Sequence, residues 1–227
     1  MKKGFRKKKI DNYEYDGWHL IHLNDDLLEV VPSDLSQIEI RTKVKFCERY
    51  AKERQMNLRF KLFENKDVDH LYVLLRQYQY ISEQEQLLMC CRVLDGKIKR
   101  MKNLTIRIVE SNHLRFLALK KECVLDNVVI GEHACFCELL YRQVGIGIAF
   151  ATIKEGKMGI FNVFVEKEYR RNGYGEQLLL ALFHWAKEIN VSSAYLNVDL
   201  DNTPAIGLYK KIGFKIETGI RILKKNG

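Results

Sequence analysis

One stretch of the 227-residue sequence, residues 160–189, constrains the fold more than any other. The short apolar run 160–165 is typical of a buried strand, and the apolar periodicity of 176–189 is typical of a helix. The polar turn between them contains Gly173 and Gly175. Glycine permits positive φ angles and close approach of the backbone to a ligand, and the N–H groups that open a helix attract anions. The turn therefore predicts a phosphate-binding loop or, alternatively, a plain tight connection.

Two arginines precede these glycines and favour the first alternative. Arg170 and Arg171 supply positive charge and bidentate hydrogen-bond donors. The dinucleotide-binding fingerprint is excluded because no third glycine stands three residues after Gly175, and the P-loop is excluded because no Lys-Ser/Thr pair follows. The pattern that remains is Arg-x-x-Gly-x-Gly, which predicts an anion-binding turn of another type.

A second pattern occupies residues 202–214, Asn-Thr-Pro-Ala-Ile-Gly-Leu-Tyr-Lys-Lys-Ile-Gly-Phe. Asn202 is a good N-cap, and Pro204 falls in the first turn, where its missing N–H does little harm. Gly213 can end the helix in the left-handed conformation. The pattern predicts a helix over 203–211, and these properties alone would suffice for an ordinary capped helix.

Taken in order, Arg-x-x-Gly-x-Gly and Asn-x-x-Ala-x-x-Leu-Tyr-x-x-x-Gly-Phe resemble the two signatures of the GNAT superfamily of N-acetyltransferases. The close resemblance covers residues 144–215. It implies the acyl-CoA N-acyltransferase fold, which is an α/β fold with a mixed sheet (α+β). It also implies acetyl-CoA as a co-substrate and no metal.

The resemblance further implies roles for individual residues. Pantetheine is expected beside the main chain of Val163 and Val165, with an N–H near Phe164 polarising the thioester carbonyl. Tyr209 is expected near the sulfur as general acid to the CoA thiolate, with a buried core aromatic as the alternative. The expected cofactor-binding residues are Val163, Phe164, Val165, Arg170, Arg171, Asn172, Gly173, Tyr174, Gly175, Glu176, Asn202 and Ala205.

The implied reaction is direct transfer of the acetyl group to a primary amine, either a small molecule or a protein N-terminus or lysine. The expected strand 159–165 carries no carboxylate to act as base, and its polar side chain, Asn162, can only hold a water. Glu138 and His133 are candidates elsewhere. The missing carboxylate favours a second interpretation, a non-catalytic CoA-binding or regulatory protein on the same fold, whereas Tyr209 favours an enzyme.

The first half of the chain resembles the second. Similar helix, strand and helix segments follow one another in both halves. The paired segments are 50–53 with 185–188, 58–63 with 194–199, and 68–78 with 203–211. The first copy lacks a glycine-rich turn. We therefore predict a degenerate GNAT-like lobe over 11–98 and a catalytic domain over 102–227, with chance similarity as the alternative.

Periodicity and turn residues predict the remaining elements. The expected strands are 17–23, 27–31, 58–63, 87–94, 104–109, 135–141, 144–152 and 158–165. One helix is expected from Ser33 or Asp34 to about residue 55, and others over 68–78, capped by Asn65 or Asp67, and after Ser111 or Asn112.

The net charge of +9 is concentrated at the start of the chain, where six of the first nine residues are Lys or Arg. We expect residues 1–10 to form a disordered, solvated tail. Such a tail could bind nucleic acid, but no aromatic interleaving or nucleic-acid motif favours that third interpretation. No apolar run approaches the ~20 residues of a membrane span, and no apolar signal-peptide region follows the basic start. A cytoplasmic protein is expected, with its oligomeric state open.

Six cysteines are present, none in a C-x-x-C pattern. In a reducing compartment they are expected to be buried thiols rather than disulfides. His133, Cys135 and Cys137 would share one face of a strand, but no fourth ligand with suitable spacing accompanies them. A zinc site is therefore not expected.

Overall fold

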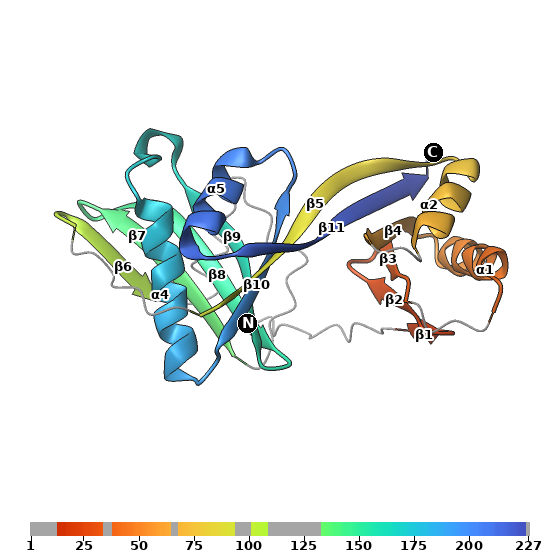
Figure 1. Ribbon diagram of the computed structural model, residues 1–227, viewed down its shortest axis with the longest axis horizontal. Helices are drawn as coiled ribbons and strands as arrows, with labels where there is room; N and C mark the ends of the chain where they lie inside the picture. The colour runs from red at the N-terminus through yellow and green to blue at the C-terminus, as the bar shows by residue number, and fades with distance from the viewer. Residues whose placement is uncertain (1–12, 34–37, 65–67, 94–100, 109–132, 226–227) are drawn as a thin grey trace, which may run out of the picture. The chain divides into compact units, whose positions relative to one another are not determined.

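The computed structural model describes residues 13–33, 38–64, 68–93, 101–108 and 133–225. The chain divides into two compact units, and each is described by itself (Figure 1). The first unit comprises Met1–Gln86 and Thr218–Gly227, and the second comprises Leu87–Glu217.

The first unit is a mixed sheet with two helices. Its elements are β1 (Tyr13–Tyr15), β2 (Trp18–His22), β3 (Leu27–Val31), α1 (Ile40–Glu53), β4 (Asn57–Phe63), α2 (Val68–Gln77), the first part of β5 (Tyr80–Arg92) and the second part of β11 (Lys215–Lys225). The strand order is β1-β2-β3-β4-β11-β5. β1, β2 and β3 form an antiparallel meander, whereas β3 and β4 are parallel.

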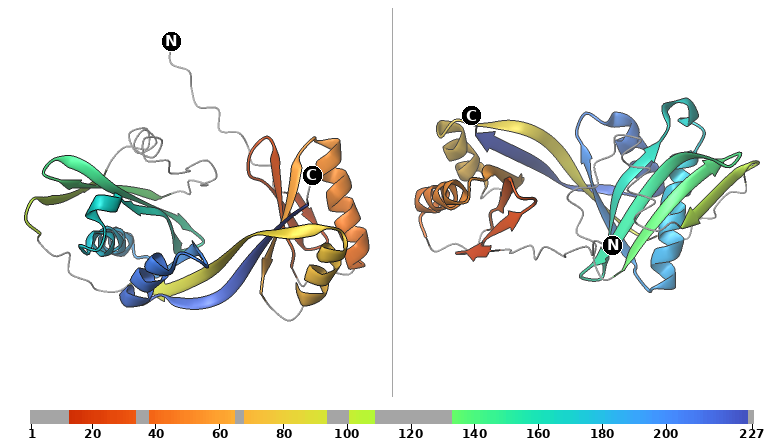
Figure 2. Two further views of the ribbon diagram at one scale, coloured as in Figure 1. Left: turned by 90° about the horizontal axis from the view of Figure 1, so that it is seen from above. Right: turned by 180° about the vertical axis from the view of Figure 1, so that it is seen from behind.

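Both helices cover the same face of this sheet (Figure 2). Alternate residues of the strands, such as Val30 and Phe60, are fully buried against them. Val44, Cys47 and Ala51 of α1 are buried at the predicted helical spacing. The apolar periodicity of the sequence therefore identified the buried face of this helix.

The second unit contains most of the remaining strands and two further helices. Its elements are the second part of β5, then β6 (Leu104–Ile108), β7 (Ala134–Tyr141), β8 (Val144–Lys154), β9 (Lys157–Val165), the 3-10 turn η1 (Lys167–Tyr169), α4 (Tyr174–Glu188), β10 (Ser193–Asp199), α5 (Thr203–Ile212) and the start of β11. The strand order is β5-β10-β9-β8-β7-β6. The four strands from β6 to β9 are antiparallel, and β9 and β10 are parallel.

Helix α4 supplies much of the core of the second unit. Leu178, Leu179, Leu182 and Phe183 are fully buried among side chains of β7, β8, β9 and β10. Among all the residues that the structure describes, no helix is long and apolar enough to cross a membrane.

The two halves of the sequence contain the same succession of elements. Antiparallel strands lead into helix, strand, helix and strand, namely α1-β4-α2-β5 in the first half and α4-β10-α5-β11 in the second. The last strand of each half joins the other half. β5 follows α2 but lies beside β10, and β11 follows α5 but pairs with β4. The sheet of the first unit therefore includes β11, which follows α5. The sheet of the second unit includes β5, which follows α2.

This exchange corrects the predicted domain limits of 11–98 and 102–227. Leu87–Arg92 belongs to the second unit, and Thr218–Lys225 belongs to the first. Periodicity indicates that a segment is a strand, but it does not indicate which neighbour pairs with it. The boundary predicted from sequence order alone was therefore misplaced at both ends.

Several predicted element limits also change. α1 begins at Ile40 with Glu39 as the N-cap, so Ser33 does not cap it; the Ser33 hydroxyl donates instead to the Gly17 carbonyl. β5 begins at Tyr80 because its polar first half still forms sheet. β1 and β11 were not predicted. The tail 1–10, the join near residue 98 and the helix expected after Ser111 or Asn112 lie outside the described residues, as do the caps Asn65 and Asp67.

Strand β11 is expected to contribute measurably to the stability of the first unit. Leu223 of β11 is fully buried in the core of the first unit, although it lies at the far end of the sequence. Leu223→Ala is expected to lower the free energy of unfolding by about 2–4 kcal/mol, because it removes buried methyl groups and leaves a cavity. Urea unfolding would measure this change. Lys215→Ala, at an exposed position of the same strand, is the control and should change stability by less than about 0.5 kcal/mol.

Candidate active site

The parallel strands β9 and β10 separate soon after they meet. They pair at only two positions, Met158 with Ala194 and Gly159 with Tyr195. On its other side β9 continues to pair with β8 as far as Val165. An opening therefore forms between the C-terminal ends of β9 and β10.

A β-bulge redirects the side chains at this end of β9. Phe161 lies opposite Phe150 and Phe164 lies opposite Ile148, so two residues of β9 face the single residue between them. The first of the two, Asn162, has a φ of 50°, a conformation that Asn tolerates better than most residues. Because the bulge shifts the alternation, Val163 and later Val165 pack toward the core that contains α4.

Two glycines shape the turn after β9 for different reasons. Gly173 is the N-cap of α4 with φ 78° and ψ 5°, and a Cβ there would meet no protein atom within 4 Å. Its backbone conformation, rather than a lack of space, therefore requires glycine. At Gly175 a Cβ would lie 2.9 Å from Cδ2 of Leu208, so the Leu208 side chain would have to shift to make room for it.

Polar side chains hold the turn in shape. The Nε of Arg170 donates to the carbonyl of Val165 at 2.9 Å, which ties the turn to the end of β9. The Nδ2 of Asn172 donates to the carbonyls of Tyr169 and Arg170 at 3.2 and 3.1 Å. Asn172 was predicted to bind the cofactor, but its amide stabilises the turn and it does not line the pocket described below.

Helix α5 forms the opposite wall. The Oδ1 of Asn202 accepts a hydrogen bond from the N–H of Ala205 at 3.3 Å, and Gly213 ends the helix with φ 102°. Both predicted caps are therefore confirmed. Further along, the Nζ of Lys211 lies 2.6 Å from Oε2 of Glu176 and joins α5 to the first turn of α4.

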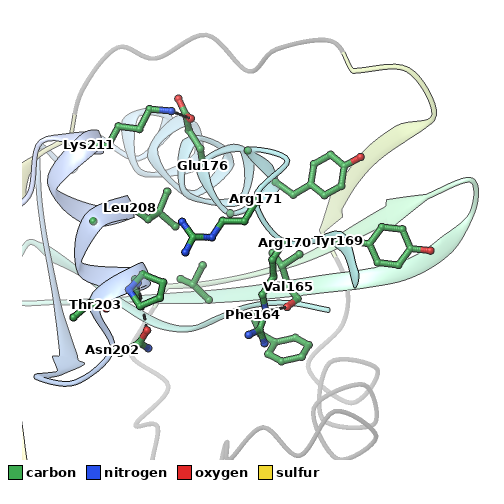
Figure 3. Close-up of a pocket in the computed structure, with 17 residues that line it drawn as sticks. Phe164, Val165, Tyr169, Arg170, Arg171, Glu176, Asn202, Thr203, Leu208 and Lys211 are labelled. Atoms are coloured by element: carbon green, nitrogen blue, oxygen red, sulfur yellow. Dashed lines mark hydrogen bonds and ion pairs between the residues drawn. The ribbon is translucent and has the colours of Figure 1, made fainter. Parts of the chain in front are cut away.

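These elements enclose a pocket of about 670 Å³ (Figure 3). It is lined by Val163, Phe164, Val165, Tyr169, Arg170, Arg171, Gly173, Tyr174, Gly175, Glu176, Asn202, Thr203, Pro204, Ala205, Gly207, Leu208 and Lys211. The structure thus brings together all the predicted cofactor-binding residues except Asn172. Six further lining residues were not predicted: Tyr169, Thr203, Pro204, Gly207, Leu208 and Lys211. The last three follow Pro204 at the spacing of one helix face, which could have identified them.

Tyr209 occupies a different position from these residues. Its side chain is 8% exposed, belongs to the core of the second unit and does not line the pocket. Its ring centroid lies 5.8 Å from that of Phe214, edge to face. Within the described ranges its hydroxyl has no hydrogen-bond partner, and burial raises the pKa of Tyr209 to about 12. The phenol therefore stays protonated at neutral pH.

The two candidate bases lie outside the pocket lining. Glu138 of β7 is 3% exposed, and one of its carboxylate oxygens lies 2.5 Å from the Nε of Arg107. His133 is exposed just before β7, whereas Cys135 and Cys137 are buried with their sulfurs 3.6 Å apart. Across the described residues, no group of three or more His, Cys, Asp or Glu side chains is placed to hold a metal ion.

Residues 83–214 match the acetyltransferase (GNAT) family over more than half of the chain, and the chain therefore belongs to this family. It is 44% identical over 64 residues to the N-alpha-acetyltransferase of Sulfurisphaera tokodaii, a match that covers 28% of this chain and 37% of that protein. It is 36% identical over 59 residues to the [ribosomal protein bS18]-alanine N-acetyltransferase of Escherichia coli K12, covering 26% of this chain and 40% of the relative. The chain thus spans well under half of these two relatives.

Solved structures resemble the chain over a much larger part of its length. The GCN5-related N-acetyltransferase from Kribbella flavida superposes with a TM-score of 0.73 over 95% of this chain and 89% of its own, at 14% identity. A tandem GNAT protein from the clavulanic acid biosynthesis pathway superposes with a TM-score of 0.69. The superposition covers 91% of this chain and 77% of that protein, at 11% identity. At such identities the likeness concerns the fold alone, and it confirms the predicted GNAT fold.

Proposed function

We propose that this chain transfers the acetyl group of acetyl-CoA to a primary amine by direct attack of the amine on the thioester. The observation that carries this proposal is the pocket, because it joins the separated end of β9, the turn around Gly173 and the capped helix α5 in one cavity. Membership of the GNAT family supports N-acetyl transfer. Acetyl-CoA as the donor is the co-substrate that this family implies.

We place the donor along the pocket from β9 to the start of α4. Pantetheine would lie beside Val163 and Val165 as an added strand, in the opening that β10 leaves. The pyrophosphate would accept hydrogen bonds from the N–H groups at the start of α4, where the helix dipole favours negative charge. Arg171 adds a cation to the same wall, and Arg170 fixes the turn through Val165.

In the reaction the amine nitrogen forms a bond to the thioester carbon, the C–S bond breaks, and CoA leaves as the thiolate. Tyr209 is proposed to donate a hydrogen bond to the departing sulfur. With a pKa of about 12, its phenol is a weaker acid than a thiol of pKa about 8.5, so full proton transfer would be uphill by roughly 5 kcal/mol. We therefore favour stabilisation of the thiolate by Tyr209, with the final proton coming from the attacking nitrogen, which is cationic in the tetrahedral intermediate and becomes the neutral amide nitrogen of the product.

The raised pKa predicts the behaviour of Tyr209 at alkaline pH. A pKa moved upward from 10 keeps the phenol neutral through pH 10, and its ionisation should begin only near pH 11. The difference between the 295-nm absorbance titrations of the wild type and Tyr209→Phe should show this single delayed phenol. An ionisation near pH 10 in that difference would indicate an exposed hydroxyl and contradict the buried position.

The acceptor is not assigned by the relatives. Their names specify α-amino groups and a ribosomal-protein alanine, but each match spans little more than a quarter of this chain. The one carboxylate among the lining residues, Glu176, is paired with Lys211 and lies at the end of the pocket away from Phe164 (Figure 3). It is therefore badly placed to act as the base for the amine.

The test is a thiol-release assay with acetyl-CoA across a panel of amines. The panel should include peptides with free N-termini, lysine-containing peptides blocked at the N-terminus, polyamines and aminoglycosides. Release of CoA with at least one amine, and an equal amount of acetylated product by mass spectrometry, would support the enzyme. Binding of CoA without turnover of any amine would favour the alternative, a non-catalytic CoA-binding protein on this fold.

A further inference from the structure

The pocket has a charged end opposite the Phe164–Val165 end, where the thioester is proposed to lie. Figure 3 shows Phe164 and Val165 at one end, the Glu176–Lys211 pair at the other, and Arg171 between them. The Lys211 ammonium lies 2.6 Å from the Glu176 carboxylate, and the Lys211 side chain is 65% exposed. Lys211 thus has a fixed partner on one side and open access on the other.

The covalent order of coenzyme A matches the order of groups along the pocket. From the sulfur the molecule continues through pantetheine and pyrophosphate to a ribose that carries a 3′-phosphate. If pantetheine follows β9 and the pyrophosphate meets the first turn of α4, the ribose continues toward Lys211. This step rests on the proposed function, which sets the direction of the donor.

Lys211 doubles the small positive charge of the pocket lining, from a formal +1 to +2. The charged lining residues are Arg170, Arg171, Glu176 and Lys211, with a formal sum of +2. A pyrophosphate diester alone carries two negative charges, and a phosphate monoester adds about −1.5 to −2 near neutral pH. Without Lys211, the Glu176 carboxylate would repel the nucleotide, because it stands beside the same helix start.

We infer that Lys211 binds the 3′-phosphate of coenzyme A and that Glu176 positions its ammonium. An ammonium group has three N–H donors, so one can remain on Glu176 while the others reach the phosphate. The contact joins two charged groups, and charge-assisted hydrogen bonds of this kind are about twice as strong as neutral ones. The chain should therefore distinguish coenzyme A from 3′-dephospho-CoA.

Isothermal titration of both ligands into wild type and variants tests this assignment. The wild type should bind CoA about tenfold or more tightly than 3′-dephospho-CoA. Lys211→Met should weaken the binding of CoA alone, so that its affinities for CoA and 3′-dephospho-CoA differ by no more than about twofold. Lys211→Arg should retain most of the ratio because the cation is kept.

Lys210→Met is the matched control. Lys210 lies on the same helix and is exposed, but it does not line the pocket. The substitution removes the same charge, and it should leave the wild-type ratio unchanged. Three results would overturn the assignment. The wild type could bind the two ligands with equal affinity, Lys211→Met could lose the same affinity for both ligands, or Lys210→Met could lose as much affinity for CoA as Lys211→Met does. A wild type that binds neither ligand would instead overturn the proposed function itself.

Discussion

Replacement of Tyr209 by phenylalanine is expected to lower kcat by about 10²–10³-fold, while acetyl-CoA affinity stays near that of the wild type. The substitution removes one hydroxyl and almost no volume, so the ring still packs against Phe214. The lost hydrogen bond forms only as the sulfur acquires charge, and the transition state alone is therefore affected. KM should change little for the same reason.

Steady-state and single-turnover kinetics of Tyr209→Phe, with an amine found in the thiol-release screen, provide the measurement. Single-turnover rates are needed because product release could mask a slower chemical step. Tyr141→Phe is a suitable control, since this ring packs against the same core without lining the pocket. Wild-type single-turnover rates in Tyr209→Phe would show that Tyr209 is only a core residue.

Replacement of Gly173 by valine is expected to weaken acetyl-CoA binding by about 10²-fold or more in a folded protein. The φ of 78° is unfavourable for a β-branched residue, and the helix start would have to rearrange. The added methyl groups would also project from a pocket wall where a Cβ meets no protein atom within 4 Å, which is the space proposed for the pyrophosphate.

Gly156→Val separates these effects from a general loss of stability. Gly156 lies in the turn between β8 and β9 with φ 72°, and a Cβ there also meets nothing within 4 Å. Its substitution should impose a similar backbone cost, but it should leave acetyl-CoA affinity intact because this residue does not line the pocket. Calorimetric titration of both variants gives the comparison, and equal affinities would refute the role assigned to the turn around Gly173.

Local features of the fold were predictable because they depend on local chemistry. The caps of α5 follow from the preferences of Asn202 and Gly213 at helix ends. The polar first half of β5 and the membership of β11 were not predictable in this way. Both depend on pairing with a distant strand, and β11 pairs with β4, more than 150 residues earlier in the chain.

The site was predictable to a similar extent. The residues of the turn around Gly173 line the pocket because the motif itself forms one wall. The role of Asn172 was assigned by its place in the motif, whereas its amide is used to bond the turn internally. Helical spacing from Pro204 could have placed Lys211 on the pocket face of α5, but that spacing does not indicate its ion pair with Glu176 on another helix.

The two crossings of the chain between its units limit how the protein could be divided or recombined. The first unit is discontinuous in sequence, since it contains both Met1–Gln86 and Thr218–Gly227. A single break anywhere within 87–217 would place parts of that unit on different fragments, which should stay associated through β4 and β11. The first unit could therefore not be gained or lost as one uninterrupted cassette, whereas the second unit, Leu87–Glu217, is continuous in sequence. A lobe that lacks the glycine-rich turn is thereby retained together with the lobe that carries it.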